Sequence, residues 1–306
     1  MLHPHRPSGA ILLFLIIWLL CILAFSGLAL LLGSAVFGME VVSAGAAAVD
    51  LPGGLSWLRT GQLINQVGVF FVPSFITALA LYGRRGAAAA LRLQTRTLAI
   101  PWLTALLLLP MALPALNVVI EWNASLDLPA ALDGMEGWMR KQEAQATALS
   151  DAFLSDMGPT SLLLNILIMA LIPGLGEELL FRGTLQPLLI RWTRSSHLGV
   201  TLSAIAFSAL HLQFFGFFPR MLLGLLLGYA FLWTRNLWVP VLMHTLNNLA
   251  VVLVYWLHAR GTITQDPETL SLPFEGWFVA FSLMLTFLGL RMLWQRRQTT
   301  PGDGTA

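Results

Sequence analysis

The chain has 306 residues, of which 57% are hydrophobic and only 10% are charged, and its mean hydropathy is +0.76. Soluble domains are about 45–50% apolar and about 25% charged. So little charge could not cover a water-facing surface, which excludes soluble enzymes, nucleic-acid-binding proteins and disordered scaffolds. The net charge of +2 is a small arginine excess rather than a basic face, so we expect no nucleic-acid partner. The single cysteine, Cys21, excludes an intramolecular disulfide.

Several apolar runs approach the length of a membrane helix, which needs about 20 consecutive apolar residues. The sequence therefore predicts an all-α fold, a polytopic transmembrane helical bundle of about eight membrane-spanning helices. The first run is far longer than the roughly 7–15 apolar residues of a signal peptide, so we expect it to be retained. The expected spans lie near 10–36, 63–82, 98–119, 160–175, 198–214, 218–234, 237–257 and 276–293.

The longest polar stretch, 121–158, carries mixed charges and loosely spaced apolar residues, and we expect it to rest on the outer membrane surface. It divides three N-terminal spans (1–120) from a core segment (159–258), which is followed by a last span and a C-terminal tail (259–306). Gly224 and Gly228 form a GxxxG pattern in the sixth span, which permits close helix packing either within the chain or between chains.

The distribution of basic residues predicts the orientation of the bundle. When the eight spans alternate, twelve of the seventeen Lys and Arg, Arg182 among them, fall in one set of loops and ends. Cytoplasmic loops carry the excess of positive charge in membrane proteins. We therefore expect a multi-pass integral membrane protein with both termini in the cytoplasm.

Ionisable side chains within the apolar runs are confined to one part of the chain, 173–248. An ionisable group at membrane depth costs about 2.5–3.5 kcal/mol on insertion scales, so such residues are rare and mark functional sites. The first three spans contain essentially none. The polar residues of this part are Glu177, Glu178, Arg182, His211, His244, Asn247 and Asn248.

The two acids of this group differ in the direction that they face. Glu178 and Arg182 are one helical turn apart, which predicts an ion pair that neutralises both charges. Glu177 points about 100° away around the helix and needs a partner from another helix, His211 and His244 being the candidates. Pro173, just before the acids, should break or kink the fourth helix. Alternatively, both acids lie at the cytoplasmic interface and reach water.

Two further polar groups come from later spans. His211 lies near the outer end of the fifth span, where a lone histidine is more often a hydrogen-bonded packing residue than a catalyst. His244 and Asn248 are one turn apart in the seventh span and face the same way, so they need polar partners from another helix.

Together these residues supply a free carboxylate, two imidazoles and an amide, a set that can activate water inside a membrane. A carboxylate and imidazoles can hold a divalent metal or act directly as bases, and an amide can donate to an oxyanion. Other intramembrane protease chemistries fit less well. The sequence has no HExxH helix and no GxSxG elbow, and no Asp lies inside a span.

At this point the sequence resembles the CAAX-protease and bacteriocin-processing family of intramembrane proteases, which includes the type II CAAX prenyl endopeptidases. The family pattern EExxxR, FxxxH, HxxxN appears in order, over about 160–255, as Glu177-Glu178…Arg182, Phe207…His211 and His244…Asn248.

The resemblance implies a role for each of these residues. It implies that Glu177 and His211 handle the attacking water or a metal, that His244 completes the site and that Asn248 stabilises the oxyanion. Glu178 and Arg182 resemble the supporting pair of the family. The chain is most similar in pattern to bacterial members, which implies a bacterial cytoplasmic (inner) membrane.

The sequence thus predicts an intramembrane metalloprotease that hydrolyses a membrane-associated peptide or protein. Glu177, His211 and His244 are the predicted ligands of a divalent metal, zinc being the first candidate. The partners are the substrate and the lipid bilayer, and prenylation of the substrate stays open. Two alternatives use the same buried polar residues: a non-catalytic membrane adaptor or immunity protein, and a secondary transporter. A transporter usually shows inverted repeats, and no part of this sequence mirrors 173–248.

The predicted orientation can be tested by thiol labelling. With Cys21 replaced, single cysteines at Ala88 and Ala146 should react with a membrane-impermeant reagent from opposite sides of the membrane. The measurement compares labelling of right-side-out and inverted vesicles. Labelling of both positions from the same side would contradict the eight-span arrangement.

Overall fold

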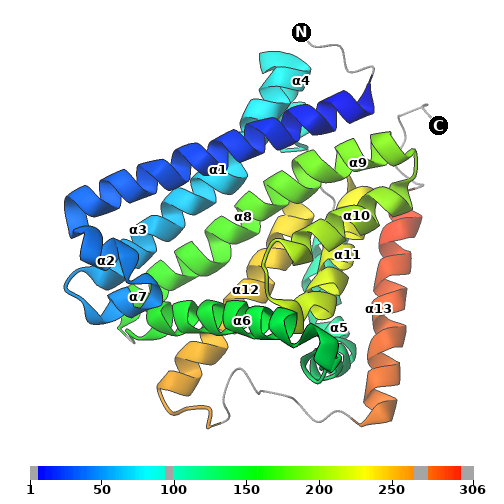
Figure 1. Ribbon diagram of the computed structural model, residues 1–306. Helices are drawn as coiled ribbons and strands as arrows, with labels where there is room; N and C mark the ends of the chain where they lie inside the picture. The colour runs from blue at the N-terminus through cyan, green and yellow to red at the C-terminus, as the bar shows by residue number, and fades with distance from the viewer. Residues whose placement is uncertain (1–5, 94–98, 157, 265–274, 298–306) are drawn as a thin grey trace.

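The structure, a computed structural model, describes residues 6–93, 99–156, 158–264 and 275–297, and these residues form helices and no strands (Figure 1). The predicted all-α class is therefore confirmed. The N-terminal half contains α1 (Pro7–Phe37), α2 (Met39–Ser43), η1 (Gly45–Asp50), α3 (Gly54–Gln66), η2 (Val67–Phe71), α4 (Val72–Ala90), α5 (Ala99–Ala124), η3 (Ala130–Leu132) and α6 (Asp133–Leu154). The second half contains α7 (Pro159–Asn165), η4 (Ile166–Leu171), α8 (Ile172–Glu178), η5 (Leu179–Leu185), α9 (Gln186–Thr193), α10 (Ser196–Ala209), η6 (Phe214–Gly216), α11 (Phe217–Thr234), α12 (Trp238–Ala259) and α13 (Gly276–Arg297).

Seven helices within the described residues are long and apolar enough to cross a membrane. The chain is therefore a multi-pass membrane protein. The expected fifth span, 198–214, differs from the other expected spans: α10 has only 14 residues, which is short for a bilayer core. The seven helices are Pro7–Phe37, Gly54–Ala90, Leu106–Ala124, Pro159–Thr193, Phe214–Thr234, Trp238–Ala259 and Gly276–Gln295.

Of the predicted break or kink at Pro173, the break is absent. Residues Pro159–Thr193 form one continuous helix of 35 residues, in which the π-helical turns η4 and η5 flank α8. Pro173 has no N–H to donate to the preceding turn, and the wider turn of η4 lies immediately before it. A helix of this length is about 52 Å long, against a bilayer core of about 30 Å. Glu177 therefore lies near the middle of the helix, deeper than the expected span 160–175 placed it.

Two expected loops also differ from the structure. Arg182, which the alternation of spans assigned to a cytoplasmic loop, is fully buried inside this long helix and does not contribute to the orientation signal. The stretch between the expected second and third spans is helical as far as Ala90, after a kink at Gly83 where φ is 69°. Residues 94–98 lie outside the described residues.

Glycines allow the helices around the long helix to approach closely. A Cβ on Gly224 would lie 3.1 Å from the Cα of Ala204, and one on Gly228 would lie 2.8 Å from Val200, so α11 packs directly on α10. The GxxxG pattern thus acts within the chain. Gly174 performs the same role on α8, where a Cβ would lie 3.0 Å from the backbone nitrogen of Thr245 in α12.

The segment 121–158 contains α6, which runs crosswise to most of the long helices (Figure 1). Its C-terminal residues Ala152, Phe153 and Leu154 are buried against α3, α7 and α12. The segment therefore closes one side of the bundle.

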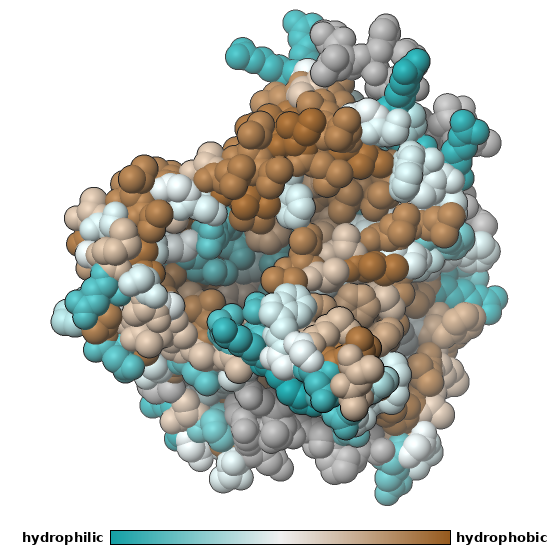
Figure 2. Space-filling view, in the orientation of Figure 1, coloured by the Kyte–Doolittle hydropathy of each residue, from teal (hydrophilic) through white to brown (hydrophobic). Residues whose placement is uncertain are grey.

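The first helix, α1, exposes a series of large apolar side chains, which form a hydrophobic area above a hollow that contains hydrophilic residues (Figure 2). An exposed apolar face of this kind suits contact with lipid.

Candidate active site

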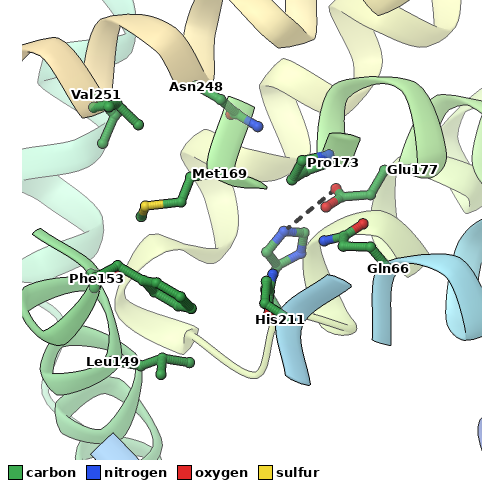
Figure 3. A pocket seen from close by; sticks show the side chains of 12 residues that line it. Gln66, Leu149, Phe153, Met169, Pro173, Glu177, His211, Asn248 and Val251 are labelled. Atoms are coloured by element: carbon green, nitrogen blue, oxygen red, sulfur yellow. Dashed lines mark ion pairs between the residues drawn. The ribbon is translucent and has the colours of Figure 1, made fainter. Parts of the chain in front are cut away.

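A cavity of about 290 Å³ lies between α3, α6, α8 and α12 and brings together three of the residues expected in the site, Glu177, His211 and Asn248 (Figure 3). It also includes side chains from α3 and α6, outside the segment 159–258 in which we expected the core. Its lining residues are Gln62, Gln66, Leu149, Ser150, Phe153, Met169, Pro173, Glu177, His211, Asn248, Val251 and Val252.

Glu177 projects from α8 towards two histidines, as expected for the acid that has no partner in its own helix. Its Oε2 atom lies 3.9 Å from Nε2 of His211 and 3.9 Å from Nε2 of His244. The residue is only 7% exposed, and Oε2 has no hydrogen-bond partner in the described part of the chain. Both imidazoles thus approach the same carboxylate oxygen from other helices.

The chain turns at His211 directly after α10, and the imidazole is held by its own helix. Nδ1 lies 2.8 Å from the carbonyl oxygen of Phe207, one turn earlier. A carbonyl can only accept, so Nδ1 carries a proton, and in the neutral imidazole Nε2 is left with a lone pair that faces Glu177. The position of His211, one turn beyond Phe207, therefore fixes its tautomer.

His244 is oriented by the second acid. Its Nδ1 donates to Oε1 of Glu178 at 2.8 Å, which again leaves Nε2 free towards Glu177. The ring of Phe207 makes T-shaped contacts with both imidazoles, with centroid distances of 5.1 Å to His211 and 5.5 Å to His244. Sequence reasoning missed the contact between Glu178 and His244, because helix spacing predicts neighbours within one helix only.

The predicted ion pair between Glu178 and Arg182 is present, at 2.7 Å, and both side chains are fully buried. The same Oε1 atom of Glu178 accepts from Arg182 and from His244. Arg182 also donates to the carbonyl oxygen of Gly224 at 3.0 Å and lies over the ring of Phe207. The pair thus connects three helices, because Gly224 brings α11 close and Gly174 brings α12 close.

Asn248 lines the cavity one turn beyond His244, as the sequence predicted. Its Oδ1 accepts a hydrogen bond of 3.3 Å from Nδ2 of Asn247. The Nδ2 group of Asn248 is the end that points into the cavity (Figure 3). The amide is therefore oriented to donate to a bound group.

Three electron-rich atoms converge at this point: Nε2 of His211, Nε2 of His244 and Oε2 of Glu177. Three acceptors that face one another in a buried place need a proton, a water molecule or a cation between them. Two His and one Glu are also a known ligand set for a catalytic zinc.

These atoms lie farther apart than the ligands of a formed zinc site. Two ligands of a tetrahedral zinc lie about 3.3 Å apart, and the separations here are 3.9 Å. Accordingly, no group of three or more His, Cys, Asp or Glu among the described residues already stands at metal-ligand spacing. The donor types are those of a divalent-metal site, and each Glu177–histidine separation would have to shorten by about half an ångström to match one.

The segment that carries most of the expected site residues is similar to known proteins. Residues 159–250 match the family model of Type II CAAX prenyl endopeptidase Rce1-like proteins. The uncharacterized protein YpbD of Bacillus subtilis (strain 168) is 32% identical over 84 residues, which are 26% of this chain and 40% of YpbD. The alignment thus spans about two fifths of that relative. No solved structure matches.

The features above define a polytopic membrane protein with a buried carboxylate and imidazole site, and the Rce1-like match covers all the predicted site residues. The resemblance stated from the sequence is therefore confirmed for this segment. The match supports a CAAX-type intramembrane protease as the kind of function. Gln62, Gln66 and the lining residues of α6 lie outside the matched segment.

The two acids should respond differently to substitution. Glu178→Gln and Arg182→Gln should each lower folded yield and melting temperature, because each leaves a buried charge uncompensated at a cost of about 3–5 kcal/mol. The double variant should be less harmful than the sum of the single variants. Glu177→Gln should leave stability nearly unchanged, because Oε2 has no hydrogen bond to lose.

Thermal unfolding of these variants in detergent, with folded yield from size-exclusion chromatography, measures the difference. Equal destabilisation by Glu177→Gln and Glu178→Gln would contradict the assignment of separate roles.

Proposed function

We propose that the protein is an intramembrane endopeptidase that cleaves a membrane-associated peptide or protein. The observation that carries the proposal is the carboxylate of Glu177 facing two imidazole Nε2 atoms inside a cavity that also holds the amide of Asn248. This arrangement supplies a base and an oxyanion donor at membrane depth, where water and polar groups are otherwise excluded.

In the proposed reaction Glu177 acts as the general base. Its carboxylate takes a proton from a water molecule, whose oxygen attacks the carbonyl carbon of the scissile peptide bond. The C–N bond then breaks, and the same proton is returned to the nitrogen of the leaving amine. One water molecule is consumed and Glu177 returns to its starting state.

The other side chains position the attacking water and stabilise the oxyanion. Nε2 of His211 accepts a hydrogen bond from the attacking water and orients it. Nδ2 of Asn248 donates to the oxyanion that forms on the carbonyl oxygen, and one such donor contributes about 10²–10³ in rate. His244 is oriented by its hydrogen bond to Glu178, and its Nε2 contacts the same water from a second direction.

We propose a second version of the same site, in which Glu177, His211 and His244 would hold a divalent metal, zinc being the first candidate, and would use their lone pairs as ligands in place of direct contacts with the water. When bound, zinc lowers the pKa of a coordinated water and so assists its deprotonation. The two Nδ1 hydrogen bonds support this proposal, because they leave both Nε2 atoms unprotonated and available as ligands.

Proteolysis should depend on Glu177. We expect Glu177→Gln to reduce turnover at least about 100-fold, the scale of a positioned general base. The measurement compares peptide termini in membrane proteomes of cells that express the parent chain, Glu177→Gln or the control Glu40→Gln, whose acid is exposed on α2. Termini that disappear only with Glu177→Gln identify the substrate.

A membrane adaptor would keep its phenotype in all three strains, and identical termini in them would contradict the proposal. Activity that persists in Glu177→Gln and is absent in a well-folded Glu178→Gln would mean that the two acids exchange roles.

The metal can be tested on the purified protein. We expect about one zinc ion per chain, loss of cleavage after treatment with a membrane-permeant chelator, and recovery when zinc is added. Elemental analysis of His211→Ala should show loss of the metal, whereas the control His197→Ala, whose imidazole contacts Tyr229 away from the cavity, should retain it. Full activity after complete chelation would support direct catalysis by Glu177 and His211 without a metal.

A further inference from the structure

Two glutamines on α3 face the same cavity as Glu177, although α3 lies outside the family match. Gln66 is only 5% exposed, and its Oε1 atom is buried without a hydrogen-bond partner. Its amide lies beside His211 and Glu177 (Figure 3). Gln62, one turn earlier, also lines the cavity. A buried amide acceptor without a partner costs free energy, which a ligand with an N–H donor would recover.

The α3 helix is held against the acids by close packing. It continues into the π-helical turn η2, and a Cβ on Gly176, next to Glu177, would lie 2.6 Å from the ring of Phe71 in η2. The short approach at Gly176 leaves the end of α3 facing the reacting groups. The position of Gln66 is therefore a product of the packing around the site.

The spacing of the two amides matches one edge of an extended peptide. Residues four apart in an α-helix are separated by about 6 Å along its axis. In an extended strand, alternate residues present their N–H and C=O to the same edge, and they are about 6.6 Å apart. A glutamine amide carries both a C=O acceptor and N–H donors, so each can pair with the N–H and C=O of one residue.

We propose that Gln62 and Gln66 form an amide ladder that binds the main chain of the substrate in an extended conformation beside Glu177. This inference rests on the proposed endopeptidase function and adds a mode of substrate recognition to it. A helical substrate keeps its scissile carbonyl hydrogen-bonded within the helix, so it must unwind before attack. Its freed N–H and C=O groups then need partners in a place that lipid otherwise surrounds. The ladder supplies them without reading the side chains.

The test uses ester substitution, in which a peptide N–H is replaced by oxygen. Full-length protein with Glu177→Gln, which should not cleave, is titrated with a dye-labelled farnesylated CAAX peptide and with the unprenylated peptide. Each is also made as a series of single-ester analogues, and binding is measured by fluorescence anisotropy. We expect two ester positions, two residues apart, to weaken binding about 3- to 10-fold each, the scale of one hydrogen bond.

Substitution of the glutamines should then remove the two sensitivities one at a time. In Gln66→Leu one position should become insensitive to the ester, and in Gln62→Leu the other position should. Asn65→Leu, on an exposed face of the same helix, should retain both. Gln66→Leu should melt no lower than its parent, since it removes an unpartnered polar atom. If it does not fold, Gln66→Met takes its place.

Ester penalties that are the same in Gln66→Leu and in its parent, or failure of both peptides to bind, would overturn the ladder. A peptide that shows the expected coupling but is not cleaved by the parent chain would contradict the endopeptidase function and not the ladder. Cleavage without coupling to either glutamine would contradict the ladder alone.

Discussion

The carboxylate of Glu178 holds together the part of the bundle on which the site depends. One oxygen atom accepts from Arg182 on its own helix and from His244 on α12, and Arg182 continues to the carbonyl of Gly224 on α11. A buried carboxylate and guanidinium neutralise each other, so the interior carries no net charge from the pair. The same contact sets the tautomer of His244 and directs its Nε2 towards Glu177. The carboxylate of Glu178 therefore both stabilises the packing of these helices and orients His244 in the site.

Glu177 has no partner comparable to that of Glu178. Its neighbour takes the arginine, and the imidazoles that approach it both turn lone pairs towards it, because each uses its Nδ1 proton elsewhere. Its Oε2 atom therefore stays unsatisfied within the protein and is available to a water molecule or a metal. An acid of this kind is costly at membrane depth. The cost is acceptable where the rest of the structure holds the acid in place, which here is done by Glu178 and Arg182.

Much of this site could be predicted from the sequence, because helix periodicity specifies which residues share a face. The pairing of Glu178 with Arg182, the separation of Glu177 from that pair and the common face of His244 and Asn248 all follow from spacings of one or four residues. The π-helical turns around α8 could not be predicted, since Pro173 signals an interruption equally well. Contacts between helices, such as that of His244 with Glu178, depend on close approaches at Gly174 and Gly224. A span limit drawn from hydropathy also placed Glu177 too near a helix end, because the helix continues through polar residues as far as Thr193.

Different parts of the chain supply the reacting groups and the opposite wall of the cavity. The groups that carry the proposed chemistry all come from 159–250, the segment shared with Rce1-like proteins. The opposite wall of the cavity comes from α3 and α6, where Gln62, Gln66 and Phe153 lie. A wall that is separate in sequence from the reacting groups can change its shape and polarity while the acids and imidazoles keep their geometry. The proposed recognition of the substrate main chain therefore rests on α3, outside the family pattern, while the proposed chemistry rests on residues within it.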